Sequence, residues 1–172
     1  MKNQTENLPF VKQPIRVKRK QQNHTLIGGE RTKKLVLIIE DDIYLIKTLR
    51  NILLVEGYDV ISADSGEDGI RMIFELYPDV ILCDIAMTRV DGYDVLKIAK
   101  SSPVTERIPF IFLTGRVNPG EEIHAVKSGV DGFIKKPFEY GELLNELKNP
   151  GLSKSKEKQA ISRPHYGLAS PI

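Results

Sequence analysis

The sequence predicts an α/β fold, a doubly wound five-stranded parallel sheet with helices on both of its faces. Three observations predict it: short unbroken apolar runs, amphipathic stretches that alternate with them, and turn or cap residues at the junctions. Unbroken apolar runs are typical of strands that are buried on both faces of a parallel sheet. Among the common doubly wound strand orders, 2-1-3-4-5 suits a sheet of five strands.

The apolar runs come in the order that this fold needs. We expect the three longest runs to be the central strands, and they cover residues 35–39, 80–83 and 110–113. Two shorter and more mixed runs, 58–61 and 132–134, suit the edge positions of the sheet.

Amphipathic stretches between these runs predict the helices. A capping pattern at 65–68 opens the second helix, and the proline at 78 is expected to end it. The apolar stripe of that helix is predicted to consist of Ile70, Ile73, Phe74 and Tyr77. A proline-containing start at 118–121 predicts a helix over about 119–128. Further stripes mark the first helix (Ile46, Leu49, Leu53) and the last helix (Leu143, Leu144, Leu147).

The charge distribution divides the chain into three parts. The net charge is +2, but residues 1–32 hold seven basic and two acidic residues, and residues 149–172 hold four and one. The middle part, 33–148, therefore carries a net charge of −6. Both ends lack a periodic apolar face, so we expect a disordered basic arm (1–32) and a disordered basic tail (149–172) around one folded domain. We expect no separate output domain in the tail.

Composition excludes several classes of protein. The single cysteine, Cys83, can form neither an intramolecular disulfide nor a zinc cage. No apolar run approaches the roughly 20 residues that a membrane-spanning helix needs, and the N-terminal stretch lacks the apolar core of a secretory signal. The chain is therefore expected to be cytoplasmic and not to associate with membranes.

Acidic residues follow two of the predicted strands at the edge where such sheets bind ligands. Glu40, Asp41 and Asp42 come after the first strand, and Asp84 ends the third. A glycine-rich phosphate loop is missing after the first strand, which disfavours a nucleotide site. Two carboxylates ~4 Å apart repel by about 4 kcal/mol at an effective dielectric constant near 20, so a cation is expected among them. Hard oxygen donors favour Mg²⁺.

A hydroxyl and an ammonium are expected at the same edge. Thr114 ends the fourth strand and Lys136 follows the fifth, whereas Lys135 should point to the other face of the sheet. A metal, a nucleophilic carboxylate, a hydroxyl and an ammonium together indicate phosphoryl transfer onto an aspartate. Asp42 is expected to cap the first helix, and Cys83 to be an inert core residue.

On these residues the chain resembles the response-regulator receiver family of two-component signalling. The motifs occur in the family's order, at strand ends, and the resemblance covers roughly residues 33–148. The resembling residues are Glu40-Asp41-Asp42, Asp84, Asp91-Gly92, Thr114-Gly115, Gly129-Val130-Asp131-Gly132-Phe133 and Lys136-Pro137-Phe138.

The resemblance implies a role for each residue of the predicted site. Asp84 would accept a phosphoryl group from a sensor histidine kinase, a phosphotransfer protein or a small donor such as acetyl phosphate. Mg²⁺ would be held by Glu40, Asp41, Asp84 and the backbone carbonyl of Ala86. Thr114 would bind a phosphoryl oxygen, Lys136 would pair with the phosphoryl group or the aspartate, and Thr114 with Phe133 would form the switch. The chain would catalyse only its own phosphorylation and dephosphorylation, so it is not expected to be an enzyme.

Three functions compete for this sequence. The leading one is a stand-alone response regulator that docks a downstream protein, with a face of helix 4, strand 5 and helix 5 through which a homodimer could form. The alternative is a nucleic-acid-associated regulator that uses the basic arm, which contains Lys12, Arg16, Lys18, Arg19 and Lys20 but no recognition helix. A phosphatase of the haloacid dehalogenase type would want an acid two residues after the nucleophile, where this chain has Ala86. Thr88 replaces a proline that is usual in the family, so the loop after Asp84 is expected to be less rigid.

Overall fold

Five parallel strands form a single sheet in the computed structural model, which describes residues 32–115 and 128–151. All of the helices and strands in the described residues belong to the unit Lys33–Ile172. The order β2-β1-β3-β4-β5 confirms the predicted strand order and fold class. The strands are β1 (Leu35–Ile39), β2 (Asp59–Ala63), β3 (Val80–Asp84), β4 (Phe110–Thr114) and β5 (Gly132–Lys135).

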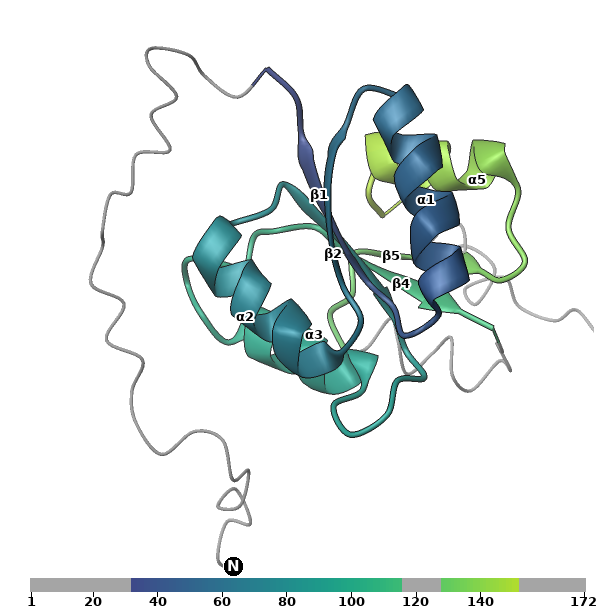
Figure 1. Cartoon of the computed structure of the whole chain (residues 1–172). Helices are drawn as coiled ribbons and strands as arrows, with labels where there is room; N and C mark the ends of the chain where they lie inside the picture. Colours follow the sequence, from purple (N-terminus) through teal and green to yellow (C-terminus); the bar gives the residue numbers. More distant parts are fainter. Residues whose placement is uncertain (1–31, 116–127, 152–172) are drawn as a thin grey trace, which may run out of the picture. The chain divides into compact units, whose positions relative to one another are not determined.

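Helices cover both faces of the sheet (Figure 1). α1 and α5 lie on one face, and α2 and α3 on the other. Their bounds are Ile43–Val55 for α1, Gly66–Leu76 for α2, Gly92–Lys100 for α3 and Tyr140–Lys148 for α5. The helix predicted over about 119–128 falls in the range 116–127, outside the described residues, as do nearly all of the two predicted basic ends.

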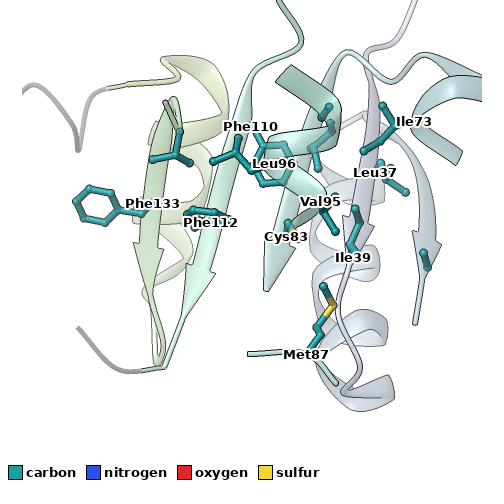
Figure 2. Packing of buried hydrophobic residues seen from close by; sticks show 14 residues of the cluster. Leu37, Ile39, Ile73, Cys83, Met87, Val95, Leu96, Phe110, Phe112 and Phe133 are labelled. Atoms are coloured by element: carbon teal, nitrogen blue, oxygen red, sulfur yellow. The ribbon is translucent and has the colours of Figure 1, made fainter. Parts of the chain in front are cut away.

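The alternation of side chains along the strands builds a separate core on each face. In β1, Leu37 and Ile39 pack under α2 and α3, whereas Val36 and Ile38 pack under α1 and α5. Figure 2 shows the first of these clusters, in which the aromatic rings of β4 lie beside side chains of α3. The unbroken apolar runs are therefore central strands, because both faces of each strand are buried.

The predicted caps are present at the starts of α1 and α2. Asp42 Oδ1 accepts hydrogen bonds from the backbone N–H groups of Tyr44 and Leu45 at 2.8 and 3.2 Å. Ser65 Oγ accepts one from the backbone N–H of Asp68 at 3.3 Å. Each cap satisfies donors that have no partner within their helix.

The prediction that Tyr77 belongs to the apolar stripe of α2 is wrong. The helix ends at Leu76, and Tyr77 adopts a left-handed backbone with φ of 47° and is 42% exposed. The physical reason is Pro78, because a proline disfavours the helical conformation of the residue before it. The chain therefore turns away from the core one residue earlier than the periodicity suggests.

Candidate functional site

Three carboxylates meet at the carboxyl ends of β1 and β3. Ile39 and Cys83 are partners across these strands, so the residues that follow them, Glu40 and Asp84, lie side by side. The side chains of Glu40, Asp41 and Asp84 each bring an oxygen within 4.8 Å of the others. Glu40 and Asp84 are only 2% and 6% exposed, whereas Asp41 is exposed and marks the side that opens to solvent.

Lys136 bridges the two buried carboxylates. Its Nζ lies 2.6 Å from Glu40 Oε2 and 2.8 Å from Asp84 Oδ1. The backbone N–H of Lys136 donates to the carbonyl of Thr114 at 2.7 Å, which fixes the start of the chain that leaves β5. The neighbouring Lys135 is exposed, whereas Lys136 contacts the two buried carboxylates.

The pKa values of this pair follow from burial and from their contact. Burial raises the pKa of Glu40, the hydrogen bond from Lys136 offsets part of that rise, and the charge of Asp84 adds to it. Burial lowers the pKa of Lys136, but its hydrogen bonds to Asp84 and Glu40 outweigh burial and leave that pKa raised. The ammonium is therefore held in its charged form between two carboxylates.

Both oxygens of the Asp84 carboxylate have a hydrogen-bond donor. Lys136 holds Oδ1, and the backbone N–H of Ala86 donates to Oδ2 at 3.1 Å. Asp84 is consequently fixed in orientation at the edge of the sheet. Ala86, two residues further along, is exposed and lies in the loop that leads to α3.

Thr114 and Phe133 lie on the neighbouring strands β4 and β5. Thr114 is the last residue of β4 and is 7% exposed. Phe133 pairs with Phe112 across the two strands and is 8% exposed. In Figure 2 its ring points away from the ring of Phe112, at the β5 end of the cluster. The two predicted switch residues are thus buried on adjacent strands.

Cys83 is buried beneath the site. Burial, together with the charge of Asp84, raises the pKa of its thiol well above the usual value. Its Sγ donates to the backbone carbonyl of Asp84 at 3.2 Å. A buried thiol that stays protonated is a core side chain, in line with the prediction.

The predicted site residues do not include those that hold the loop after Asp84. Gly92 packs so closely on the loop that a Cβ there would lie 2.4 Å from the carbonyl oxygen of Asp84. Met87 is 7% exposed and anchors the loop in the core. Gly92 could have been found from the Asp91-Gly92 motif, whereas an isolated methionine carries no comparable signal.

The donor set suits a hard divalent cation. Three carboxylates converge around one ammonium, so the ionised cluster keeps an excess of negative charge. Carboxylate oxygens are the donors that Mg²⁺ binds through, usually together with waters and a phosphate. The residues present therefore fit Mg²⁺.

The comparison with protein families identifies the class to which this fold and site belong. The model of the response regulator receiver domain matches residues 36–148. The chain therefore belongs to the response regulator receiver domain family of two-component systems. The resemblance inferred from the motifs is confirmed.

Curated relatives are described as regulators of transcription. The probable transcriptional regulator ycf29 of Pyropia yezoensis is 32% identical over 114 residues, which cover 66% of this chain and 51% of that protein. The probable transcriptional regulator ycf27 of Guillardia theta is 36% identical over 113 residues, covering 65% and 43%. This chain spans about half the length of the curated relatives it matches.

Solved receiver structures share the fold. A putative response regulator from Chloroflexus aurantiacus has a TM-score of 0.65 and 32% identity, covering 68% of this chain and 96% of that one. The chemotaxis response regulator CheY4 of Vibrio cholerae has a TM-score of 0.65 and 26% identity, covering 68% and 98%. Across 32–115 and 128–151, no helix has the length and apolar character needed to cross a membrane.

Proposed function

We propose that this receiver domain is a switch that is phosphorylated on Asp84 by a sensor histidine kinase or a phosphotransfer protein. The observation that carries the proposal is the Asp84 carboxylate, held by Lys136 and the N–H of Ala86 beside two further acids. An Asp84 oxygen attacks the phosphorus of the donor's phosphohistidine, the P–N bond breaks, and the imidazole leaves with the bonding electrons and takes up a proton. The product is an aspartyl phosphate.

Mg²⁺ would be held by Glu40, Asp41, Asp84 and the backbone carbonyl of Ala86. When bound, it would supply positive charge to the oxygens of the transferring group. The chain's own contribution is to gather the carboxylates, to orient Asp84 and to place Lys136 where negative charge grows. In this proposal Thr114 binds a phosphoryl oxygen of the product.

The proposed chemistry is limited to the chain itself. Asp84 is both nucleophile and product, so the domain catalyses only the gain and loss of its own phosphoryl group and is not an enzyme for an outside substrate. We also propose that it works in the cytoplasm, where a histidine kinase presents its phosphohistidine.

The signal is proposed to leave the domain by protein docking, as in a stand-alone regulator. Phosphorylation would bias two arrangements of Thr114 and Phe133, and with them the surface formed by β5 and α5. A downstream protein, or a second copy of the chain, would bind one arrangement better.

The phosphoryl proposal is tested by intact-mass spectrometry after incubation with acetyl phosphate. We expect a phosphoryl adduct that requires Mg²⁺ or Mn²⁺, is abolished by EDTA and is absent from Asp84→Asn. Asp59→Asn is the matched control, because Asp59 is an exposed carboxylate at the start of β2. An undiminished adduct on Asp84→Asn would overturn the assignment.

The docking proposal is tested at Phe133. Phe133→Ala should leave phosphorylation intact but weaken partner binding or dimerisation about tenfold, because a buried ring that sets the surface is lost. Phe133→Tyr should bind as the native chain does. Sedimentation and pull-down with a beryllofluoride mimic measure both variants, and equal binding by Phe133→Ala contradicts the switch.

A second candidate function is regulation of transcription. The observation that favours it is the similarity to the probable transcriptional regulators ycf29 and ycf27, of whose length this chain spans about half. In this second candidate function the receiver domain controls DNA binding. The DNA would be bound either by another domain of the protein or by the basic residues at 1–32. Salt-sensitive binding of the mimic-loaded chain to duplex DNA, lost when 1–32 is deleted, would favour the arm.

A further inference from the structure

The loop between β3 and α3, residues 85–91, positions a backbone group that contacts Asp84. It contains Ala86, whose N–H holds Asp84 Oδ2 at 3.1 Å. The end of the loop is tied back to its start, because the N–H of Gly92 donates to the carbonyl of Ile85 at 3.1 Å. A displacement of this loop therefore displaces a group that contacts the proposed phosphoacceptor.

The middle of the loop contains a strained turn. The N–H of Val90 donates to the carbonyl of Thr88 at 3.0 Å, and Arg89 between them has φ of 70°. A three-residue turn with a positive φ at a residue other than glycine is rare and costs on the order of 1–3 kcal/mol. Such a conformation persists only where the surroundings determine it. Arg89 itself is exposed, so the support comes from its neighbours.

The start of α2 supplies that support through Gly66. A Cβ on Gly66 would lie 2.4 Å from the carbonyl oxygen of Val90 and 2.8 Å from its Cγ1. The backbone of Gly66 does not have a positive φ, so its conformation does not require glycine. Position 66 has room for no side chain, because the loop occupies the space that a Cβ would fill. The backbone of α2 thus rests directly against the turn that follows Ala86.

We propose that Gly66 is a positioning residue for the phosphoacceptor site. Its missing side chain lets the first turn of α2 support Val90, which holds the strained turn and so sets the place of Ala86 beside Asp84. An alanine at 66 would push the loop by on the order of 1 Å, since a carbon needs about 3.5 Å from its neighbours. The effect on phosphorylation rests on the proposed function, whereas the effect on the loop does not.

Gly66→Ala tests the proposal, with Gly141→Ala as the matched control. Both glycines lie in the first turn of a helix, but a Cβ on Gly141 would meet nothing within 4 Å. Without Mg²⁺, amide exchange at 86–91 should rise about tenfold in Gly66→Ala and stay unchanged in the control. The Mg²⁺ concentration at half-maximal labelling by acetyl phosphate should rise about tenfold in Gly66→Ala alone.

A second substitution on the loop side keeps the test decisive if Gly66→Ala does not fold. Val90→Ala removes the Cγ1 that faces Gly66, and we expect faster exchange at 86–91 and a higher Mg²⁺ midpoint. In a double-mutant cycle, Gly66→Ala should have a smaller effect in the Val90→Ala background.

Native exchange at 86–91 in both single variants would overturn the positioning role. If the native chain takes no phosphoryl group at all, the proposed function fails, but the exchange measurement still decides the role of Gly66. A raised Mg²⁺ midpoint in Gly66→Ala that is smaller, but not abolished, in the Val90→Ala background supports the direct contact, because the carbonyl oxygen of Val90 still faces position 66.

Discussion

Two lysines with equally exposed side chains, 21% each, sit at opposite edges of the sheet and have different surroundings. Lys100, at the amino ends of β4 and β5, contacts the carbonyls of Glu106 and Ile108 and the carboxylate of Asp131 at 2.7 to 2.9 Å. Asp131 Oδ2 also accepts the N–H of Phe110. One ammonium and one carboxylate are balanced there, and neutral groups complete the set.

Lys136, at the carboxyl ends of the strands, faces carboxylates in excess. Glu40 and Asp84 both contact its Nζ, and Asp41 completes the acidic group. A balanced cluster with neutral partners stabilises the fold and calls for no ligand. A cluster with excess negative charge attracts a cation, or a ligand that binds together with a cation. The charge of the groups around each lysine, and not the burial of its side chain, therefore separates the two roles.

The largest expected difference between the two lysines is in phosphorylation. Lys136→Met should lower the rate of labelling by acetyl phosphate about 100-fold, because a charged donor beside Asp84 is lost. Lys100→Met should be labelled like the native chain. Equal labelling rates for the two variants, measured by intact mass over time, would contradict a role of Lys136 in phosphorylation that Lys100 does not share.

A smaller difference is expected in stability. Either substitution should cost about 2 kcal/mol of unfolding free energy in EDTA, since charged hydrogen-bond partners are left behind. Saturating Mg²⁺ should restore most of the loss in Lys136→Met, because the cation replaces the missing positive charge. In Lys100→Met the loss should persist. Urea unfolding with and without Mg²⁺ measures both, and rescue of Lys100→Met would contradict the distinction.

The smallest expected effect is a pH dependence at Glu40. Its pKa is raised in the folded chain above the usual 4.5, so the folded state binds this proton more tightly than the unfolded state. The corresponding stability is present below the unfolded pKa and is lost as the pH rises through the folded pKa. In metal-free urea titrations, Glu40→Gln should therefore lose less stability than the native chain as the pH rises from 4.5. Identical pH profiles for the two chains would argue against a raised pKa of Glu40 in the folded state.

Local patterns in the sequence predicted the strands well, and tertiary contacts account for what they missed. The run 35–39 became β1 with the predicted bounds, whereas β2 extends to Ala63 because it pairs with β1 as far as Ile39. A strand's end is thus set by its neighbour as much as by its own composition. Glu40 and Asp84 could be placed together because parallel strands end at one edge.

Contacts between distant elements left no such pattern. Gly66 looked like a member of a helix cap, and nothing in the sequence places it against Val90. Lys100 and Asp131 are 31 residues apart, and many pairs of opposite charge in this chain have a similar separation. The candidate site was therefore predictable as far as strand ends define it. The loop that supports it was not, because its position depends on α2.

The three consecutive acids after β1 also limit how this gene can change. Glu40 meets Lys136, Asp41 belongs to the exposed side of the acidic group, and Asp42 caps α1. Each side chain makes its contacts only at its own number of residues after Ile39, the last residue of β1. An inserted or deleted codon directly after Ile39 would shift all three acids away from their own positions, so length variation should be tolerated at the chain's ends and eliminated here.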